Sequence, residues 1–319
     1  MPKIDHHNAP LIAAAWAVFA VLCFSTNDVL VKVMAGGLPL YQVMFVRTVV
    51  GLIFIVAVLV PITGETLRTT RLRSHMLRGL CVLLANFLFF LGLAAMPLAE
   101  ATAIFFVSPF LISAFSSWFL GEKVGPRRWL AIAVGMVGVL IVLRPGSQAF
   151  QLAALLPLLA AVAYALLHTM TRFLGATENA TAMAFYIQMT FLAISASAGL
   201  ALGDGRFDTF DHPSAEFLLR AWTWPTTRDL ILMSLLGVTS SVGGYAIGQA
   251  FRKSEAAFVA PFEYIAMPIA VFWGLTVFGE WPDNTALAGI ALILASGLFL
   301  VWREAIVKRR AALDGPRRL

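Results

Sequence analysis

The chain has 319 residues, of which 60% are hydrophobic and 13% are charged, and its formal net charge is +6. Soluble domains contain about 45–50% apolar and about 25% charged residues, so this composition excludes an ordinary soluble globular protein. The positive charge does not indicate a nucleic-acid partner, because the basic residues stand between long apolar segments and orient the chain in a lipid bilayer.

Apolar windows of about 19 residues predict about ten membrane-spanning helices, and hence an all-α membrane protein. The first apolar run has no small-residue cleavage pattern, so we expect it to remain as a membrane span. The longest connection is residues 203–228, and its stretch 214–224 is expected to form an interfacial helix with Trp222 and Trp224 as anchors. The predicted spans are Leu11–Val33, Leu40–Val60, His75–Ala95, Ala99–Leu120, Arg128–Leu143, Leu152–Arg172, Ala180–Leu202, Asp229–Phe251, Ala256–Phe278 and Ala286–Arg303.

The sequence carries no motif for catalysis or cofactor binding. Cys23 and Cys81 lie inside apolar spans without metal-binding spacing and are expected to be small packing residues. There is no G-x-x-x-x-G-K-[ST] phosphate-binding loop, no H-E-x-x-H motif and no nucleophile elbow. We therefore expect a protein that is not an enzyme, with no cofactor, no metal site and no direct use of ATP.

Three features near the middle of the chain recur near its C-terminal end at almost constant separation. Each pair is 158 or 159 residues apart, which indicates an internal duplication. The pairs are Pro109 with Pro268, Gly121–Glu122 with Gly279–Glu280, and the run GVLIVLR ending at Arg144 with GLFLVWR ending at Arg303. A weaker correspondence, 140 residues apart, relates Phe24, Asp28 and Lys32 to Tyr164, His168 and Arg172.

Each copy contains five predicted spans, an odd number, so the second copy enters the membrane from the opposite side. The sequence therefore predicts two inverted five-helix repeats around a central cavity, at residues 11–146 and 150–303, with tails at 1–10 and 304–319. Placing both termini in the cytoplasm puts seventeen of the 23 Lys and Arg residues on the cytoplasmic side and four outside. This bias predicts the orientation.

The stretch AEA…SP…LGEK…GVLIVLRPG and its second copy, SEAAFVAPFEY…FGE…SGLFLVWRE, resemble the drug/metabolite transporter superfamily, EamA-type. The resemblance covers essentially everything from Leu11 to Arg303. Within the family, the PLAEATAIFF and PFEY segments look like the bacterial subgroup labelled S-adenosylmethionine or riboflavin uptake carriers, while other relatives export amino acids and related metabolites. The resemblance implies a small organic solute, a cavity enclosed by the first four helices of each half, and fifth and tenth helices outside it.

Ionisable side chains within spans are the first site candidates, because they are costly in lipid unless they face water or a partner. Arg47 either binds a substrate carboxylate or phosphate or forms an ion pair between helices. Glu263 is flanked by Pro261 and Pro268, which remove backbone donors and are expected to loosen the helix there. Its carboxylate serves proton coupling, binds a cationic group, or is a structural partner of Arg47. Asp28 either faces the site or pairs with Lys32, one turn away.

Neutral and aromatic candidates complete the predicted site. His168 either relays protons or forms an interhelical hydrogen bond. Asn86, Gln188, Tyr245, Gln249 and Tyr264 would offer donors and acceptors to a polar organic substrate. Tyr186 and Trp273 either stack on a substrate ring or simply pack. Glu100, Glu122, Glu255 and Glu280 lie at span ends, where helix capping or gating contacts are expected.

The sequence thus predicts a secondary transporter of the bacterial inner membrane that moves a small polar or amphiphilic metabolite by alternating access. Its partners would be the substrate, the bilayer and, if transport is ion-coupled, protons. The alternatives are a lipid-carrier flippase, an exporter of the same superfamily, or an intramembrane enzyme using His168 or Glu263. The glycines of the fifth and tenth spans favour close helix packing or a dimer contact, so a monomer and a homodimer both stay open.

Overall fold

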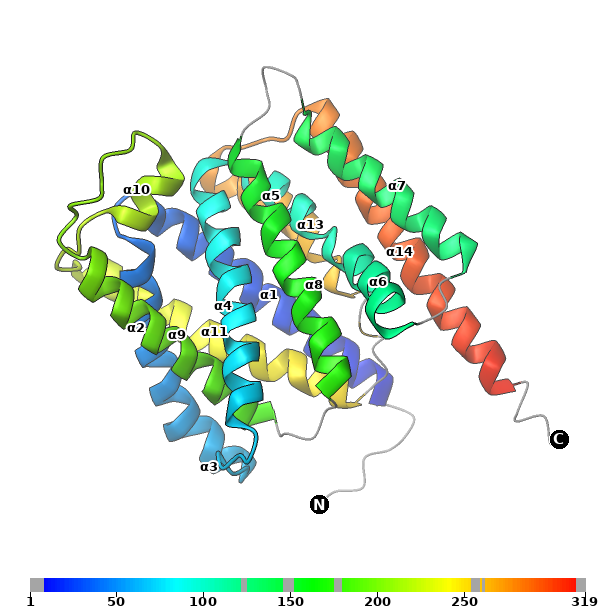
Figure 1. Cartoon of the computed structure of the whole chain (residues 1–319), viewed down its shortest axis with the longest axis horizontal. Coiled ribbons are helices and arrows are strands. Elements are labelled where there is room, and N and C mark those ends of the chain that lie inside the picture. Colours follow the sequence, from blue (N-terminus) through cyan, green and yellow to red (C-terminus); the bar gives the residue numbers. More distant parts are fainter. Residues whose placement is uncertain are drawn as a thin grey trace.

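The computed structural model describes residues 9–121, 125–145, 152–174, 180–253, 259 and 262–313, and in these ranges every regular element is helical. Figure 1 shows them as a bundle of long helices. The elements are α1 (Ala9–Ala35), α2 (Leu40–Phe54), η1 (Ile55–Leu59), α3 (Val60–Thr63), α4 (Leu72–Ala95), α5 (Leu98–Phe105), α6 (Ser108–Leu120), α7 (Pro126–Leu143), η2 (Leu152–Ala154), α8 (Leu155–Leu174), α9 (Ala180–Leu202), α10 (Pro213–Leu219), α11 (Thr227–Lys253), α13 (Ala266–Trp273), η3 (Gly274–Phe278) and α14 (Asn284–Leu313).

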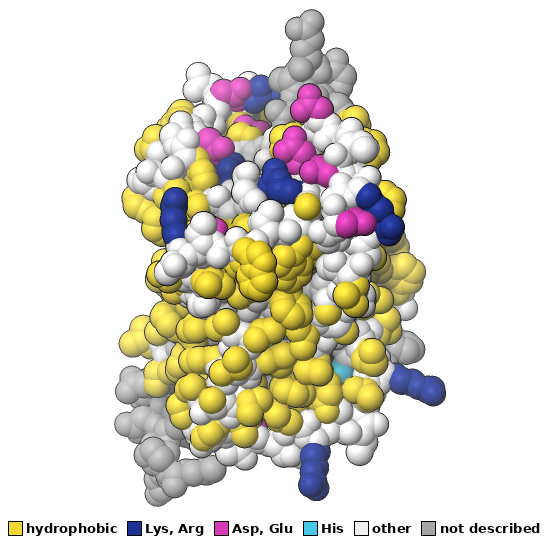
Figure 2. All heavy atoms as spheres, turned by 90° about the vertical axis from the view of Figure 1, so that its left-hand side faces the viewer, with side chains coloured by type: hydrophobic (Ala, Val, Ile, Leu, Met, Phe, Trp, Pro, Cys, Tyr) yellow, Lys and Arg dark blue, Asp and Glu magenta, His cyan; other side chains and the backbone are white. Residues whose placement is uncertain are grey.

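The helices confirm an all-α membrane protein. Eight segments in the described ranges are long and apolar enough to cross a membrane, and two shorter apolar segments, Leu152–Leu167 and Ala266–Phe278, occupy the sixth and ninth predicted spans. Figure 2 shows apolar side chains covering a broad band of one face, with most charged side chains gathered above it. Such a band is what a chain solvated by lipid requires.

The short helix in the longest connection is α10, which ends at Leu219, earlier than predicted, because Arg220 has an extended backbone. The Ser214 hydroxyl donates to the Leu91 carbonyl (2.7 Å), and the Tyr41 hydroxyl donates to the Arg220 carbonyl (2.7 Å). These bonds hold α10 against the ends of α2 and α4. Trp224 is 96% exposed and so is free to anchor at the bilayer surface.

The helices pack in a pattern that is unchanged when the two halves of the chain are exchanged. The α1–α11 pair corresponds to the α8–α4 pair, while α2–α9 and α7–α14 each join equivalent elements of the two halves, and α5–α13 joins the fourth predicted span to the ninth. Figure 1 shows α7 and α14 side by side at one edge of the bundle. This is the position that the family resemblance implied for the fifth and tenth helices.

The α7–α14 pair is unusually close at two glycines. A Cβ atom on Gly138 would lie 3.0 Å from the Gly289 carbonyl oxygen, and one on Gly289 would lie 2.8 Å from the Gly138 oxygen. Both distances are too short for a side chain, so the two backbones touch here. Gly138 and Gly289 therefore pack α7 against α14 within one chain.

Two spans are interrupted at equivalent places. The chain leaves the helix at Phe106–Val107, between α5 and α6, and at Tyr264–Ile265, just before α13. Pro109 and Pro268 each follow their break by two or three residues, and proline cannot donate the hydrogen bond of a continuous helix. The interruption that the prolines around Glu263 predicted is therefore present, and it recurs in the first half.

Candidate functional site

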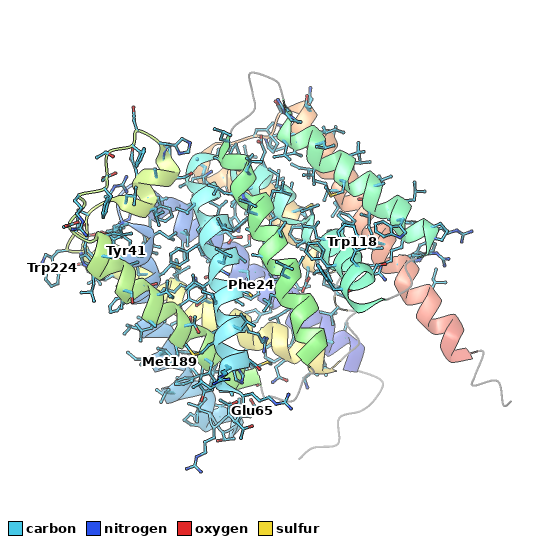
Figure 3. The ribbon with its side chains drawn as sticks, viewed as in Figure 1. Phe24, Tyr41, Glu65, Trp118, Met189 and Trp224 are labelled. Atoms are coloured by element: carbon cyan, nitrogen blue, oxygen red, sulfur yellow. The ribbon has the colours of Figure 1, made fainter. Side chains whose placement is uncertain are left out.

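Asp28 lies on the inward face of α1. The exposed side chains Phe19, Leu22 and Val33 form one stripe along the helix, and at 100° per residue Asp28 is about 150° away from it. Asp28 is nevertheless only half-buried. Phe24, one turn earlier on the same inward face, is 38% exposed although it packs against α11 at Gly243, and Figure 3 places it near the middle of the bundle. Both residues therefore keep accessible surface on the inward face of α1.

Arg47 lies in α2 with only 9% of its surface exposed. Its guanidinium stands over the Phe191 ring, 5.5 Å from the centroid, and its Nη1 donates to the Met44 sulfur at 3.2 Å. Its charge interacts electrostatically with Asp28. No direct hydrogen bond joins the two side chains among the described contacts. Asp28 is thus a nearby, accessible carboxylate, and it does not form the direct ion pair that was the alternative for Arg47.

Glu263 is the last residue before the second helix break and is half-buried. Within the described part of the chain its carboxylate has neither a hydrogen bond nor an ion pair, so it is not the structural partner of Arg47. It interacts electrostatically with the hydroxyl of Tyr164 in α8, and the Tyr164 ring lies 5.3 Å from the Phe105 ring. The site thus contains a carboxylate that has no partner among the described residues and lies beside aromatic rings.

Tyr164 faces inward by the same reasoning as Asp28. Leu155, Leu159 and Leu166 form the exposed stripe of α8, and Tyr164 lies about 155° from it. Tyr164 was noted in the sequence only as the counterpart of Phe24. That correspondence could have identified Tyr164 as an inward-facing residue, because both aromatic residues occupy inward, partly accessible positions of equivalent helices.

Of the two alternatives for Asp28, the pairing with Lys32 is not formed. The Lys32 ammonium binds both oxygens of Glu280, at 2.7 and 2.9 Å, and donates to the Met96 carbonyl at 2.7 Å. Glu280 also accepts the Leu98 amide at 3.1 Å, at the start of α5. We call Lys32 with Glu280 the outer ion pair, and the end of the bundle where it lies the outer end.

The Gly-Glu signature explains how Glu280 reaches this position. Gly279 has φ +66° and Gly121 has φ +67°, a left-handed conformation that side chains disfavour. Each glycine ends a helix, and the Glu280 amide then donates back to the Gly274 carbonyl (2.9 Å). Glu280 thus contacts α1 and α5 from its span end, whereas Glu122 and Glu255 lie outside the described residues.

Asn86 and Gln188 lie away from the lipid-facing stripes. Asn86 is half-buried on α4, where its amide donates to the Val82 carbonyl at 2.9 Å. Gln188 is buried and donates to the Ser241 hydroxyl at 3.5 Å, where it packs against Gly51. Gln188 therefore joins α9 to α2 and α11, and Asn86 stays a candidate for the inner surface.

The aromatic candidates are used in packing. Tyr264 is buried, with its ring 5.1 Å from the Phe106 ring. Trp273 is half-buried against Phe272, with ring centroids 5.2 Å apart. Tyr186 stacks on His75 at 4.8 Å and donates to the Leu67 carbonyl.

Tyr245 and Gln249 share the face of α11 that carries the exposed residues Ile231 and Leu235. Both are half-buried, and the Tyr245 ring packs edge-to-face on the Trp16 ring of α1, with centroids 6.0 Å apart. No described contact joins either residue to Asp28 or Glu263. The side chain of His168 lies outside the described residues.

Arg144 and Asp283 form an ion pair at the outer end that the sequence did not reveal. It joins the end of α7 to the start of α14. The hydrogen bond from Arg144, with a further one from the Ala286 amide, holds the pKa of Asp283 below its usual value, and the same contact raises the pKa of Arg144.

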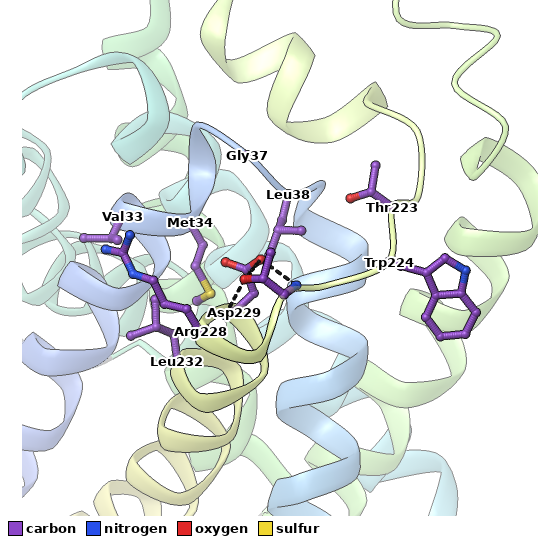
Figure 4. Close-up of a pocket in the computed structure, with 10 residues that line it drawn as sticks. Val33, Met34, Gly37, Leu38, Thr223, Trp224, Arg228, Asp229 and Leu232 are labelled. Carbon is purple, nitrogen blue, oxygen red and sulfur yellow. Dashed lines mark hydrogen bonds between the residues drawn. The ribbon is translucent and has the colours of Figure 1, made fainter.

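A cavity of about 310 Å³ opens between the end of α1 and the start of α11 (Figure 4). Val33, Leu38, Trp224 and Arg228 are among its lining residues. Asp229, at its edge, accepts hydrogen bonds from Thr226 at the start of α11. None of the predicted site residues lines this cavity, so we do not assign it to the substrate.

Comparison with known proteins places these features in a family. The EamA-like transporter family matches residues 11–144. The S-adenosylmethionine uptake transporter of Rickettsia bellii is 28% identical over 293 residues, 92% of this chain and 94% of that protein. The riboflavin transporter of Rhizobium johnstonii is 30% identical over 304 residues, 95% of both chains.

Two further comparisons agree. The pseudopaline exporter of Pseudomonas aeruginosa is 30% identical over 89% of this chain and 94% of its own. A crystal structure with 19% identity superposes with a TM-score of 0.59 over 92% of this chain and 98% of that one, which supports the fold. From the multi-pass helical architecture and these near full-length similarities, we conclude that the chain belongs to the EamA-like transporter family of the drug/metabolite transporter superfamily.

Proposed function

We propose that this protein is a secondary carrier that moves a small metabolite with a cationic centre across the bacterial inner membrane by alternating access. The observation that carries the proposal is Glu263, an accessible carboxylate without a described partner, on an interrupted helix beside Tyr164 and Phe105. A carboxylate kept un-neutralised at membrane depth is costly and indicates a ligand or a proton path.

The carrier would consist of two inverted repeats, residues 11–146 and 150–303, with both termini in the cytoplasm. The exchange symmetry of the helix pairs and the equivalent helix breaks support this arrangement. The outer ion pair brings together the ends of α1, α4 and η3, as strict alternation of the spans requires. The Lys and Arg bias then assigns the outer end to the extracytoplasmic side.

The substrate would contact two groups of residues. Asp28 and Arg47 offer a negative and a positive charge to a zwitterionic or polar head group. Glu263 with the aromatic rings of Tyr164 and Phe105 offers a site for a cation. The three charges sum to −1, which favours S-adenosylmethionine-like sulfonium compounds over the uncharged ring system of riboflavin. Protons are the coupling ion that two accessible carboxylates would serve.

Transport by the purified protein in proteoliposomes tests the proposal. Three labelled solutes are supplied with and without a proton gradient: S-adenosylmethionine, riboflavin, and S-adenosylhomocysteine, a thioether analogue whose sulfur carries no charge. We expect uptake and counterflow of the sulfonium compound, weak uptake of the thioether, and no uptake by protein-free liposomes. Preferential transport of riboflavin, or of none of the three, would contradict the substrate assignment.

The direction of transport needs its own measurement, because the relatives include both uptake carriers and an exporter. Equal volumes of vesicles are loaded with substrate or suspended in it under the same proton gradient. Faster movement toward the acidic compartment would support proton-driven export, and faster movement away from it would support proton-driven uptake.

A further inference from the structure

We propose that the outer ion pair, Lys32 with Glu280, closes the extracytoplasmic entrance to the substrate site and has to separate for that entrance to open. The inference rests on the proposed alternating access. It assigns a function to two residues outside the substrate site, both with partners that only the folded chain brings together.

The Lys32 ammonium uses all of its hydrogen-bond donors in this contact. An ammonium group has three donors, and Lys32 uses them on the two Glu280 oxygens and the Met96 carbonyl, all within 2.9 Å. The ammonium also stands over the Phe278 ring, 5.0 Å from its centroid. The Lys32 side chain is only 10% exposed and that of Glu280 is 29% exposed, so water screens the pair poorly.

The pair joins the two proposed repeats at one end only. Lys32, Met96 and Leu98 belong to the first repeat, and Glu280 belongs to the second. Glu280 is therefore the group through which the second repeat holds both α1 and the start of α5. When the repeats separate at the outer end, the bonds of Glu280 to Lys32 and to the Leu98 amide are lost together, whereas the Lys32–Met96 bond stays within the first repeat.

The pair also lies above the substrate site on the same face of α1. Lys32 follows Asp28 by one helical turn and Phe24 by about two, a rise of about 12 Å at 1.5 Å per residue. A molecule entering along this face from the outer end would pass the ion pair before it reaches either residue. A closed pair would hence exclude water-soluble molecules from the site.

Other charged groups surround the pair without replacing it. Glu100, in the first turn of α5, interacts electrostatically with Lys32, Glu280, Arg144 and Asp283. Arg144 has its own partner in Asp283. This second pair joins α7 to α14, which lie at the edge of the bundle, and so provides a control at the same end of the molecule.

Accessibility of a single cysteine tests the inference without any substrate. Phe24→Cys is introduced with Cys23→Ala and Cys81→Ala, and a membrane-impermeant maleimide is applied to right-side-out and inside-out vesicles. With Lys32→Gln or Glu280→Gln, we expect labelling from the outer face to rise about tenfold and labelling from the cytoplasmic face to fall. The reason is that the outward-open state gains population at the expense of the inward-open state. Lys32→Arg and the control Asp283→Asn should keep the parent rates.

Unchanged outer labelling in both Gln variants would overturn the inference. A rise from both faces would also overturn it, because it would report loosened packing rather than an opened entrance. A rise confined to the cytoplasmic face would support the closing function and reverse the orientation. If labelling rose from the outer face and fell from the cytoplasmic face in a protein that transports none of the tested solutes, the closing function of the ion pair would be supported. Only the proposed carrier function would then be contradicted.

Discussion

The rings of Phe106 and Tyr264 pack with their centroids 5.1 Å apart and their planes inclined by 45°. Each residue lies at the helix break of its own half of the chain. The contact therefore joins the two interrupted spans, and Glu263, the residue before Tyr264, is held beside it. Movement of one broken helix against the other would change the surroundings of this carboxylate directly.

Replacing Glu263 by Gln keeps the side-chain shape and removes its charge. We expect transport of a cationic substrate to fall by at least about tenfold, because the attraction of the carboxylate for the cation is lost. Thermal stability should stay the same or rise, since an un-neutralised carboxylate at membrane depth is costly. Uptake in proteoliposomes and the unfolding temperature check the two effects, and loss of both together would indicate a structural role instead.

Replacing Asp28 by Asn leaves the Arg47 guanidinium without its nearby negative charge. We expect a loss of about 1–3 kcal/mol in the free energy of unfolding, the usual cost of an uncompensated buried group. Adding Arg47→Met should recover much of this loss, because the charge itself is then gone. Denaturant unfolding in detergent measures the cycle. Strictly additive losses would show that the two residues do not interact.

Gly297 accommodates the ring of Tyr264, and a Cβ atom there would overlap it. Gly297→Ala should therefore destabilise the protein by about 1–3 kcal/mol, as other overpacked cores are destabilised. Gly36→Ala is the matched control, because a Cβ atom added at Gly36 would have no other atom within 4 Å. The unfolding temperatures of the two variants give the comparison, and equal values would contradict the close packing of α14 on Tyr264.

The Arg144–Asp283 pair predicts a pH-dependent contribution to stability. The folded protein holds the pKa of Asp283 below its usual value of 3.8, with the hydrogen bond from Arg144 as the main cause. The contribution is thus fully present above that usual value and is lost as the pH falls through the lower, folded-state pKa. The difference in unfolding temperature between the parent and Asp283→Asn should shrink on acidification below pH 3.8. A difference that grows on acidification would contradict this sign.

Much of the fold was predictable because lipid imposes a simple requirement on the sequence. Each span has to be about 20 apolar residues long, so span number and approximate bounds follow from composition along the chain. The prolines around Glu263 likewise predicted a helix interruption, since a missing amide donor acts locally. Arg47, Asp28 and Glu263 could be selected for the same reason: a charge within an apolar run is visible without knowing its neighbours.

The partners of those charges were not predictable. Asp28 and Lys32 are four residues apart and suited to pair along one helix, yet Lys32 binds Glu280, 248 residues away. Local spacing shows which pairs are possible, whereas the choice depends on which helix ends the bundle brings together. Tyr245 is a second example, since only the packing of α11 on α1 places its ring against Trp16.

The sequence by itself determined the class of protein, the spans, the repeated motifs and the charged residues at membrane depth, because each is a property of short stretches. The tertiary structure alone decided which helices pair, that Tyr164 lies beside Glu263, and that Lys32 closes on Glu280. These contacts join residues from distant parts of the chain, and their geometry exists only once the helices have packed.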